Sequence, residues 1–143
     1  MLDAHRFGDL SGSFCYAGCV YTQVAYNSHV KAVFVELPAF ERNRQDYLDD
    51  AGFARLQQYL MTNPDAGDVI EATGGLRKLR FADARRGKGK RGGLRVIYYW
   101  WTEGLQFWLY TLYDKDEVSD LTPKERKTLK TMIKAELEAR SRK

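Results

Sequence analysis

Hydrophobic residues recur with a strand-like pattern mainly in the second half of the chain. Three segments there are rich in aromatic and β-branched residues: Leu76–Phe81, Gly93–Trp101 and Leu105–Tyr113. A short turn around Glu103–Gly104 joins the last two. Ala32–Leu37 is a shorter run of the same kind. The pattern therefore predicts four strands, three of them consecutive.

Helical signals separate the first of these strands from the other three. Pro38 suits the first turn of a helix, because its missing N–H would have no partner there. Asp49 or Asp50 is expected to cap a second helix, and the Asn63–Pro64 pair is expected to end it. Within that helix, hydrophobic residues recur at helical spacing, namely Phe53, Leu56 and Leu60.

The last helix has the clearest beginning in the sequence. Thr122 as N-cap, Pro123 in the first position and Glu125 three residues after the cap form the pattern of a capping box. The buried stripe of this helix is expected to consist of Leu129, Met132, Ile133 and Leu137.

These elements follow the order β-α-α-β-β-β-α, which predicts an α+β fold with a twisted, mostly antiparallel sheet packed against helices. The chain has 143 residues, enough for one domain with a proper core. Regular periodicity begins at Val30, whereas residues 1–29 show no clear helical period. We therefore predict one domain over residues 30–143. Residues 1–29 are interpreted as a leader outside the core fold, or as an over-extended start.

Two further features narrow the class of protein. No hydrophobic run is long enough to span a bilayer, so a membrane protein is not expected. The two cysteines, Cys15 and Cys19, form no disulfide framework and fit a reducing compartment, which points to the cytoplasm. A metal site needs more ligands than these cysteines with His5 and His29 would supply, so neither a metal nor a cofactor is predicted.

Positive charge is concentrated in one segment of the chain, from Leu76 to Trp101. Between Leu76 and Trp101 there are nine Lys or Arg and one acid, Asp83, whereas the rest of the chain carries 14 basic and 18 acidic residues. The net charge of +4 therefore hides a cationic segment on a mildly acidic body. Such a distribution is typical of proteins that bind polyphosphates.

Alternation divides the cations of this segment between a strand and a loop. In Leu76–Phe81, a period of two places Lys78 and Arg80 on one face, with Leu79 and Phe81 on the other. The following residues, 82 to 93, contain too much Gly, Lys and Arg for a strand and are expected to form a mobile hairpin loop.

The order of elements and two sequence runs resemble the RelE/ParE toxin superfamily, and within it the HigB-type toxins of type II toxin–antitoxin systems. The runs are GGLRKLRF…GKGKRGGLRVIYYW and LYTLYDKDEVSDLTPKERK, and the resemblance covers Val30 to Arg140. It implies a RelE-like fold and an endoribonuclease that enters the ribosomal A site and cuts mRNA, which inhibits translation. The implied partners are the ribosome, mRNA and a cognate helix-turn-helix antitoxin, with operator DNA bound only through the antitoxin.

The resemblance also implies catalytic positions. Two lysines on the second strand of RelE-like enzymes correspond to Lys78 and Arg80, and the arginine that opens the next strand corresponds to Arg95. A Lys–Arg pair near the C-terminus of the family falls on Lys115 and Asp116, so only its lysine is present.

Metal-free cleavage of RNA through its own 2′-hydroxyl requires proton transfers and stabilisation of a charged phosphorane. Neither histidine belongs to the predicted domain, so the proton transfers would fall to Lys, Arg or Tyr. Arg95 is expected to clamp the transition state, because its planar guanidinium matches two phosphate oxygens. Contacts to RNA are expected from Arg77, Arg85, Arg86, Lys88, Lys90, Arg91 and Tyr113.

Less specific interpretations stay open. Tyr98–Trp101 offers stacking surfaces for bases, but half of any strand faces the core, so at least two of these four residues are expected to be structural. A non-catalytic RNA-binding module also explains the charge. ParE-like toxins share the fold and bind DNA gyrase, but they lack the cationic set that Lys78, Arg80 and Arg95 form here.

Overall fold

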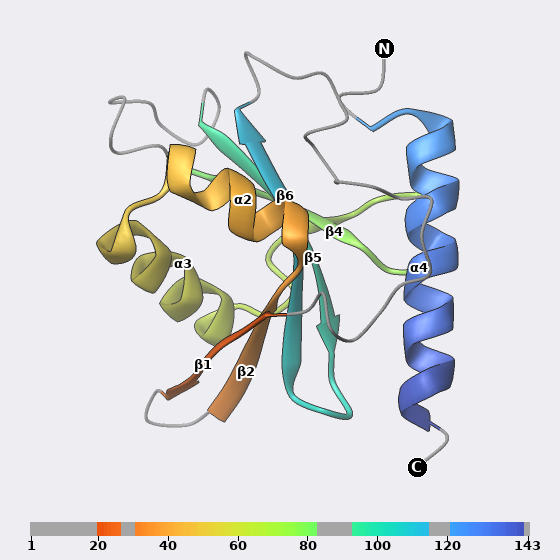
Figure 1. Ribbon diagram of the computed structural model, residues 1–143, viewed down its shortest axis with the longest axis horizontal. Helices are drawn as coiled ribbons and strands as arrows, with labels where there is room; N and C mark the ends of the chain where they lie inside the picture. The colour runs from red at the N-terminus through yellow and green to blue at the C-terminus, as the bar shows by residue number, and fades with distance from the viewer. Residues whose placement is uncertain (1–19, 27–30, 83–92, 115–120, 142–143) are drawn as a thin grey trace.

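The computed structural model describes residues 20–26, 31–82, 93–114 and 121–141, which fold into a mixed sheet with helices on both sides (Figure 1). The sheet has six strands: β1 (Val20–Tyr26), β2 (Lys31–Glu36), β3 (Asp68–Val69), β4 (Arg77–Phe81), β5 (Leu94–Trp101) and β6 (Gln106–Asp114). The helices are α2 (Pro38–Tyr47), α3 (Asp50–Thr62) and α4 (Pro123–Ser141). The α+β class predicted from the sequence is confirmed.

Across the sheet the strands lie in the order β1-β2-β6-β5-β4-β3. Four of the five neighbouring pairs are antiparallel, and β2 with β6 is the parallel pair. After β2 the chain forms α2 and α3, and then β3 and β4 at the opposite edge of the sheet. It next forms β5 and finally β6, which pairs with β2. Of the strands that carry the cationic segment, β5 lies beside β6 and β4 lies beside β5, in the half of the sheet away from β1.

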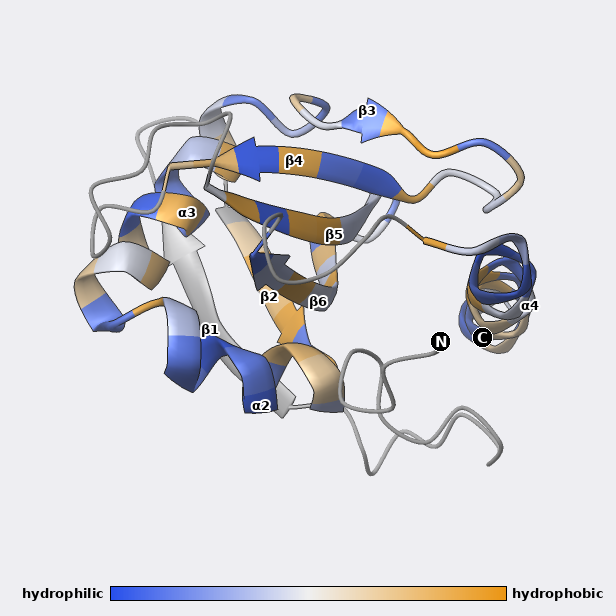
Figure 2. Cartoon of the chain, turned by 90° about the horizontal axis from the view of Figure 1, so that it is seen from above, coloured by the Kyte–Doolittle hydropathy of each residue, from blue (hydrophilic) through white to orange (hydrophobic). Residues whose placement is uncertain are grey.

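The helices form separate layers on the two faces of the sheet, with α2 and α3 on one face and α4 on the other (Figure 2). We call the hydrophobic residues under the first layer the α2–α3 core and those under the second the α4 core. Phe34 and Phe107 stack at the centre of the α2–α3 core with their rings 4.8 Å apart. Ile97, Trp108, Leu129 and Ile133 belong to the α4 core.

The start of α3 has the chemistry that the sequence predicted. Asp49 rather than Asp50 is the N-cap, and its carboxylate accepts a hydrogen bond from the Gly52 N–H at 2.7 Å. Such a cap satisfies one of the backbone donors that have no partner within the helix. Leu56 and Leu60 are fully buried, which confirms the predicted apolar stripe.

The predicted capping box of α4 is also confirmed. The Thr122 Oγ1 accepts from the Glu125 N–H at 3.2 Å, and the Glu125 carboxylate accepts from the Thr122 N–H at 3.0 Å. Further along the helix, Leu129 and Ile133 are buried, while Met132 and Leu137 are half-buried against the same core.

The sheet extends beyond the predicted domain boundary. Val20–Tyr26 of the expected leader forms β1, which pairs with β2 along the edge of the sheet. The register of this pair shifts between Tyr21 and Gln23, as it does at a β-bulge. The two-residue strand β3, which pairs with Lys78 and Arg77, is a second strand that the sequence pattern did not predict.

Among the described residues, no helix combines the length and the apolar character needed to cross a membrane.

Candidate functional site

The structure brings three predicted catalytic residues together on adjacent strands. Arg80 of β4 pairs with Arg95 of β5, and Arg95 pairs in turn with Tyr113 of β6. Lys78 lies two residues before Arg80, opposite Ile97. Directly opposite residues in an antiparallel pair have Cα atoms 4.5 to 5.5 Å apart, roughly, and their side chains share a face. Lys78, Arg80 and Arg95 therefore form one group, which we call the cationic row.

The cationic row lies on the α4 side of the sheet. Leu79 and Phe81, the alternate residues of β4, pack into the α2–α3 core. Ile97 and Tyr113, which share the face of the cationic row, belong to the α4 core. The alternation predicted for this strand is therefore confirmed.

The members of the cationic row differ in burial. Arg80 is exposed, Lys78 is half-buried, and only 4% of Arg95 is accessible. The Arg95 Nη1 donates a hydrogen bond to the Leu94 carbonyl at 3.3 Å. A buried guanidinium needs such acceptors, because an unsatisfied charge in the interior is strongly destabilising. Arg95 is thus held in place behind the more accessible Arg80.

Sheet stability does not explain why two arginines face each other. Like charges directly opposite one another destabilise a sheet, by an amount comparable to the roughly 0.2–1 kcal/mol of a favourable cross-strand pair. The Arg80–Arg95 pair is therefore a place where a neighbouring anion, from the protein or from a ligand, is favourable. A bound polyanion would turn the same pair into a favourable arrangement.

A β-bulge in β6 brings Tyr113 next to Arg95. Tyr98 pairs with Leu109 and Arg95 pairs with Tyr113, so β6 has one more residue than β5 between these two pairs. Without that extra residue, Leu112 would lie opposite Arg95. Bulges often re-aim side chains beside functional sites, and here the bulge exchanges an aliphatic neighbour for a phenol.

Tyr113 was predicted to contact RNA, but it lies inside the protein. Only 2% of its surface is accessible, and it packs in the α4 core with Leu121. A ring in this position has no open face on which a base can stack. In the described structure, Tyr113 therefore packs beside Arg95 instead of offering the RNA contact that the sequence predicted.

Arg77, a second predicted RNA contact, stabilises a turn. Its Nη1 donates to the carbonyls of Asp65 at 3.2 Å and Gly67 at 2.8 Å. The Tyr98 hydroxyl donates to the Pro64 carbonyl at 2.8 Å and accepts from the Gly67 N–H at 3.1 Å. Burial raises the pKa of Tyr98, partly offset by the Gly67 hydrogen bond and the Arg77 charge. Arg77 and Tyr98 thus hold the turn that follows α3.

The run of four aromatic residues in β5 packs mainly against other rings. Trp100 stacks on Phe107 at 4.2 Å on one face, and Tyr99 stacks on Trp108 at 5.1 Å on the other. Burial, and secondarily the Glu103 charge, raises the pKa of Tyr99. The structural interpretation of Tyr98–Trp101 is therefore confirmed for at least two of the four.

A buried carboxylate lies at the same end of the sheet, and sequence reasoning did not single it out. Asp114, the last residue of β6, is fully buried and pairs with Leu94, the neighbour of Arg95 in the chain. Aspartate is rarely buried without a specific partner. The sequence signal that could have identified Asp114 is its place directly after the hydrophobic run LYTLY. A polar residue that ends a central strand is often functional or structural.

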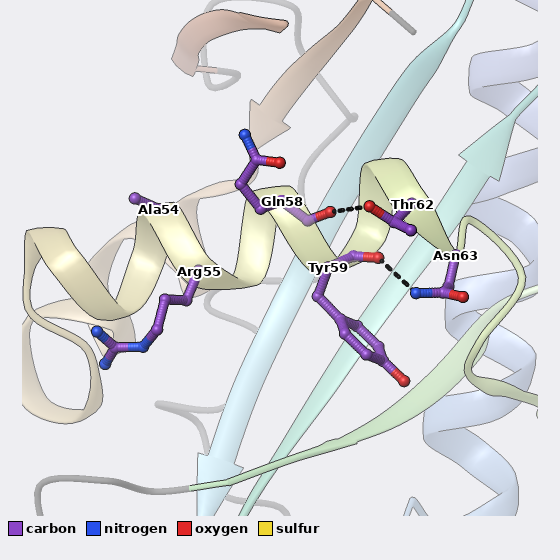
Figure 3. Close-up of a pocket in the computed structure, with 6 residues that line it drawn as sticks. All are labelled: Ala54, Arg55, Gln58, Tyr59, Thr62 and Asn63. Carbon is purple, nitrogen blue, oxygen red and sulfur yellow. Dashed lines mark hydrogen bonds between the residues drawn. The ribbon is translucent and has the colours of Figure 1, made fainter. Parts of the chain in front are cut away.

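A separate hollow of about 480 Å³ lies along the outer side of α3 (Figure 3). It is lined by Ala54, Arg55, Gln58, Tyr59, Thr62 and Asn63. The Thr62 hydroxyl donates to the Gln58 carbonyl at 3.0 Å, and the Asn63 amide donates to the Tyr59 carbonyl at 3.3 Å. Those side chains serve the end of the helix, and no member of the cationic row lines the hollow.

The remaining predicted site residues, Lys115, Arg85, Arg86, Lys88, Lys90 and Arg91, lie outside the described residues. Within the described part of the chain, no group of three or more His, Cys, Asp or Glu is arranged to hold a metal ion. The chain matches no model of a known protein family.

Proposed function

We propose that this protein is a ribosome-dependent mRNA endoribonuclease, a HigB-type toxin of the RelE/ParE superfamily that acts in the cytoplasm. The pairing of Arg80 with Arg95, with Lys78 on the same face, carries the proposal. An α+β fold with a largely antiparallel sheet supports it, as do the two sequence runs that resemble the family.

The proposed reaction is an attack of the RNA 2′-hydroxyl on the adjacent phosphate. The new bond joins the 2′-oxygen to phosphorus, the bond to the 5′-oxygen breaks, and the products are a 2′,3′-cyclic phosphate and a 5′-hydroxyl. The proton lost by the 2′-hydroxyl passes to a basic group, and the leaving 5′-oxygen receives one. No metal takes part in this scheme.

The cationic row suits the charge that develops in this reaction. Arg80, which is exposed, is the first contact for the phosphate. Arg95, directly opposite Arg80 and 4% exposed, would offer its N–H donors to the phosphorane once bound RNA uncovers it. Lys78 lies next to both and supplies the proton for the leaving oxygen. Lys115 is proposed as a further cation of the site.

The proposed partners follow from the same assignment. The toxin would act on mRNA in the ribosomal A site, and the loop cations from Arg85 to Arg91 would contact RNA phosphates. A helix-turn-helix antitoxin would neutralise the toxin and would bind operator DNA for the pair.

Mapping RNA ends in cells tests this function directly. Expression of the wild-type chain should produce new 5′ ends inside translated regions, and Arg95→Gln should not produce them. The variant must reach the same soluble level as the wild type, and its thermal melting must match. Wild-type cells without new ends would refute the nuclease.

A non-catalytic RNA-binding module is the second candidate, and the burial of Arg95 favours it, since a cation with 4% exposure also suits a purely structural role. This candidate predicts RNA binding and translational arrest without new RNA ends. The same mapping experiment separates it from the nuclease.

A further inference from the structure

The outward side of α4 carries a row of lysines. Lys124, Lys127, Lys130 and Lys134 are all exposed and stand three, three and four residues apart. On an α-helix this spacing gathers them on one side, over about 15 Å of axis. Leu129 and Ile133 are buried in the α4 core. We call the four residues the lysine face, which lies on the side of α4 opposite the buried Leu129 and Ile133, with Lys130 at its flank beside Gly74.

Two of the three acidic residues of α4 are turned inward, and the third, Glu138, is exposed beyond the C-terminal end of the lysine face. Glu125 is 2% exposed, and its carboxylate completes the capping box with Thr122. Glu136 is 4% exposed and binds the Arg140 Nε at 2.6 Å. From Lys124 to Lys134, a stretch that the structure describes throughout, no carboxylate is exposed.

Helix stability does not account for this arrangement. Lys124 lies in the first turn, at the positive end of the helix dipole, where cations are unfavourable. Lys130 and Lys134 are separated by four residues, and like charges at that spacing repel. Each effect is a few tenths of a kcal/mol, roughly, and all act against the helix. The lysine face therefore makes sense as a surface that meets an anion.

We propose that the lysine face binds the phosphate backbone of duplex RNA, as a contact separate from the cleavage surface. Lysines act as flexible point charges that hold phosphates without reading bases. The large hydrophobic residues exposed in the described chain are Val69 and Leu105, and neither lies on α4. The face thus lacks the apolar anchors that a membrane surface or a protein hot spot uses.

This inference takes RNA as the partner from the proposed function, but it concerns a different part of the molecule. Because the lysine face lies on the side of α4 opposite the buried Leu129 and Ile133, one RNA segment lies on α4 while another lies in the cleavage site. The duplex contact would hold the enzyme on a folded RNA while the single strand is cut. Two linked contacts raise the effective concentration of the second.

Fluorescence anisotropy with a short labelled RNA duplex tests the proposal. The duplex carries 2′-O-methyl groups throughout, so it cannot be cleaved through its 2′-oxygens. Lys127→Gln/Lys134→Gln is compared with Arg42→Gln/Arg55→Gln, which removes two exposed cations from α2 and α3. Lys130 is left intact because its side chain packs beside Gly74.

The α4 variant should bind more weakly and should lower the slope of log affinity against log salt by about two, close to one per lost phosphate contact. The α2–α3 variant should keep the wild-type slope. Thermal melting of the α4 variant should match or exceed that of the wild type, since the substitutions remove repulsion. Weaker binding with undiminished stability is the signature of a binding surface.

Three outcomes would overturn the inference: an unchanged slope in the α4 variant, an equal loss in both variants, or a lysine face that binds polyglutamate or anionic vesicles in preference to RNA. The failure of the proposed function is distinguishable. If the α4 variant binds RNA more weakly but the wild type yields no new RNA ends in cells, the lysine face is supported as an RNA contact and the proposed nuclease activity is refuted.

Discussion

The two faces of the sheet are built in different ways. Toward α2 and α3 the sheet buries mainly aliphatic and aromatic side chains, with Phe34, Trp100 and Tyr98 around the ring of Phe107. Toward α4, hydrophobic residues share the face with the cationic row. Toward α2 and α3, the buried charge of Glu36 is paired with Arg44 at 2.7 Å, whereas toward α4 three cations lie together.

The attachment of α4 illustrates the second kind of face. The Gln106 Oε1 accepts hydrogen bonds from the Trp108 Nε1 and the Arg140 Nη1, each at 3.0 Å. The Arg140 guanidinium also lies 5.0 Å from the centre of the Trp108 ring, within cation–π range. Polar contacts fasten the C-terminal end of α4, while its N-terminal half presents lysines to solvent. The comparison places the residues of the proposed site on the α4 side and the larger ring cluster on the α2–α3 side.

The largest effect on stability is expected from the α2–α3 core. Phe107→Ala removes a fully buried ring with three aromatic neighbours, and it should lower the free energy of unfolding by about 3–5 kcal/mol. Urea denaturation of both proteins measures the difference. A loss below about 1 kcal/mol would mean that this layer is not the main core.

A smaller loss is expected at Tyr98, which ties β5 to the turn after α3. Tyr98→Phe leaves the Gly67 N–H and the Pro64 carbonyl without this partner, so it should destabilise the fold by about 1–3 kcal/mol. Equilibrium denaturation at neutral pH measures this loss of unfolding free energy. An unchanged denaturation midpoint would show that water replaces both hydrogen bonds.

The same residue predicts a pH dependence. Because the folded state raises the pKa of Tyr98 above 10.0, its contribution is complete below pH 10 and is lost as the pH rises through the folded-state pKa. The wild type should therefore lose stability in the alkaline range more steeply than Tyr98→Phe. Parallel alkaline slopes in the two proteins would contradict the assignment.

Removing the cap of α4 should have a moderate effect. Thr122→Ala leaves the Glu125 N–H without its side-chain acceptor and should cost about 1 kcal/mol. Thr122→Ser keeps the hydroxyl and serves as the matched control, with a loss well below that of alanine. Equal losses in the two variants would show that the methyl group, not the cap, matters.

The smallest effect has the opposite sign. Arg80→Gln removes one of two opposed cations and should leave stability unchanged or raise it by up to about 1 kcal/mol. Arg42→Gln, on the outer side of α2, should have no effect. A clear loss of stability in Arg80→Gln would mean that Arg80 supports the sheet, which would blur the contrast between the two faces.

Local signals predicted the parts of the fold that depend on neighbouring residues. The capping box at Thr122 and Glu125, the cap at Asp49 and the alternation around Lys78 all involve residues within a few positions of one another. Such patterns are determined by backbone geometry that a sequence displays directly. The shared face of Lys78 and Arg80 followed from that alternation, whereas the position of Arg95 opposite Arg80 depends on the register between β4 and β5.

The features of the fold that the sequence did not predict depend on pairing between residues far apart in the chain. The place of β1 depends on β2 accepting a bulged partner, and the burial of Tyr113 depends on one extra residue in β6. A single bulge reverses which residues share a face, and no local pattern marks it. The burial of Arg95 and Asp114 depends likewise on what covers the ends of β5 and β6.

The rate of mRNA cleavage on purified ribosomes tests the central claim most directly. Arg95→Gln and Arg95→Lys are compared with wild type and with Arg42→Gln, and the melting temperature of each is recorded. We expect Arg95→Gln to cut about a hundredfold to a thousandfold more slowly while staying folded, the loss typical of one removed donor to a developing oxyanion. Arg95→Lys keeps the charge without the fork and should fall in between. A folded Arg95→Gln protein that cuts at the wild-type rate would contradict the claim that the cationic row performs the reaction.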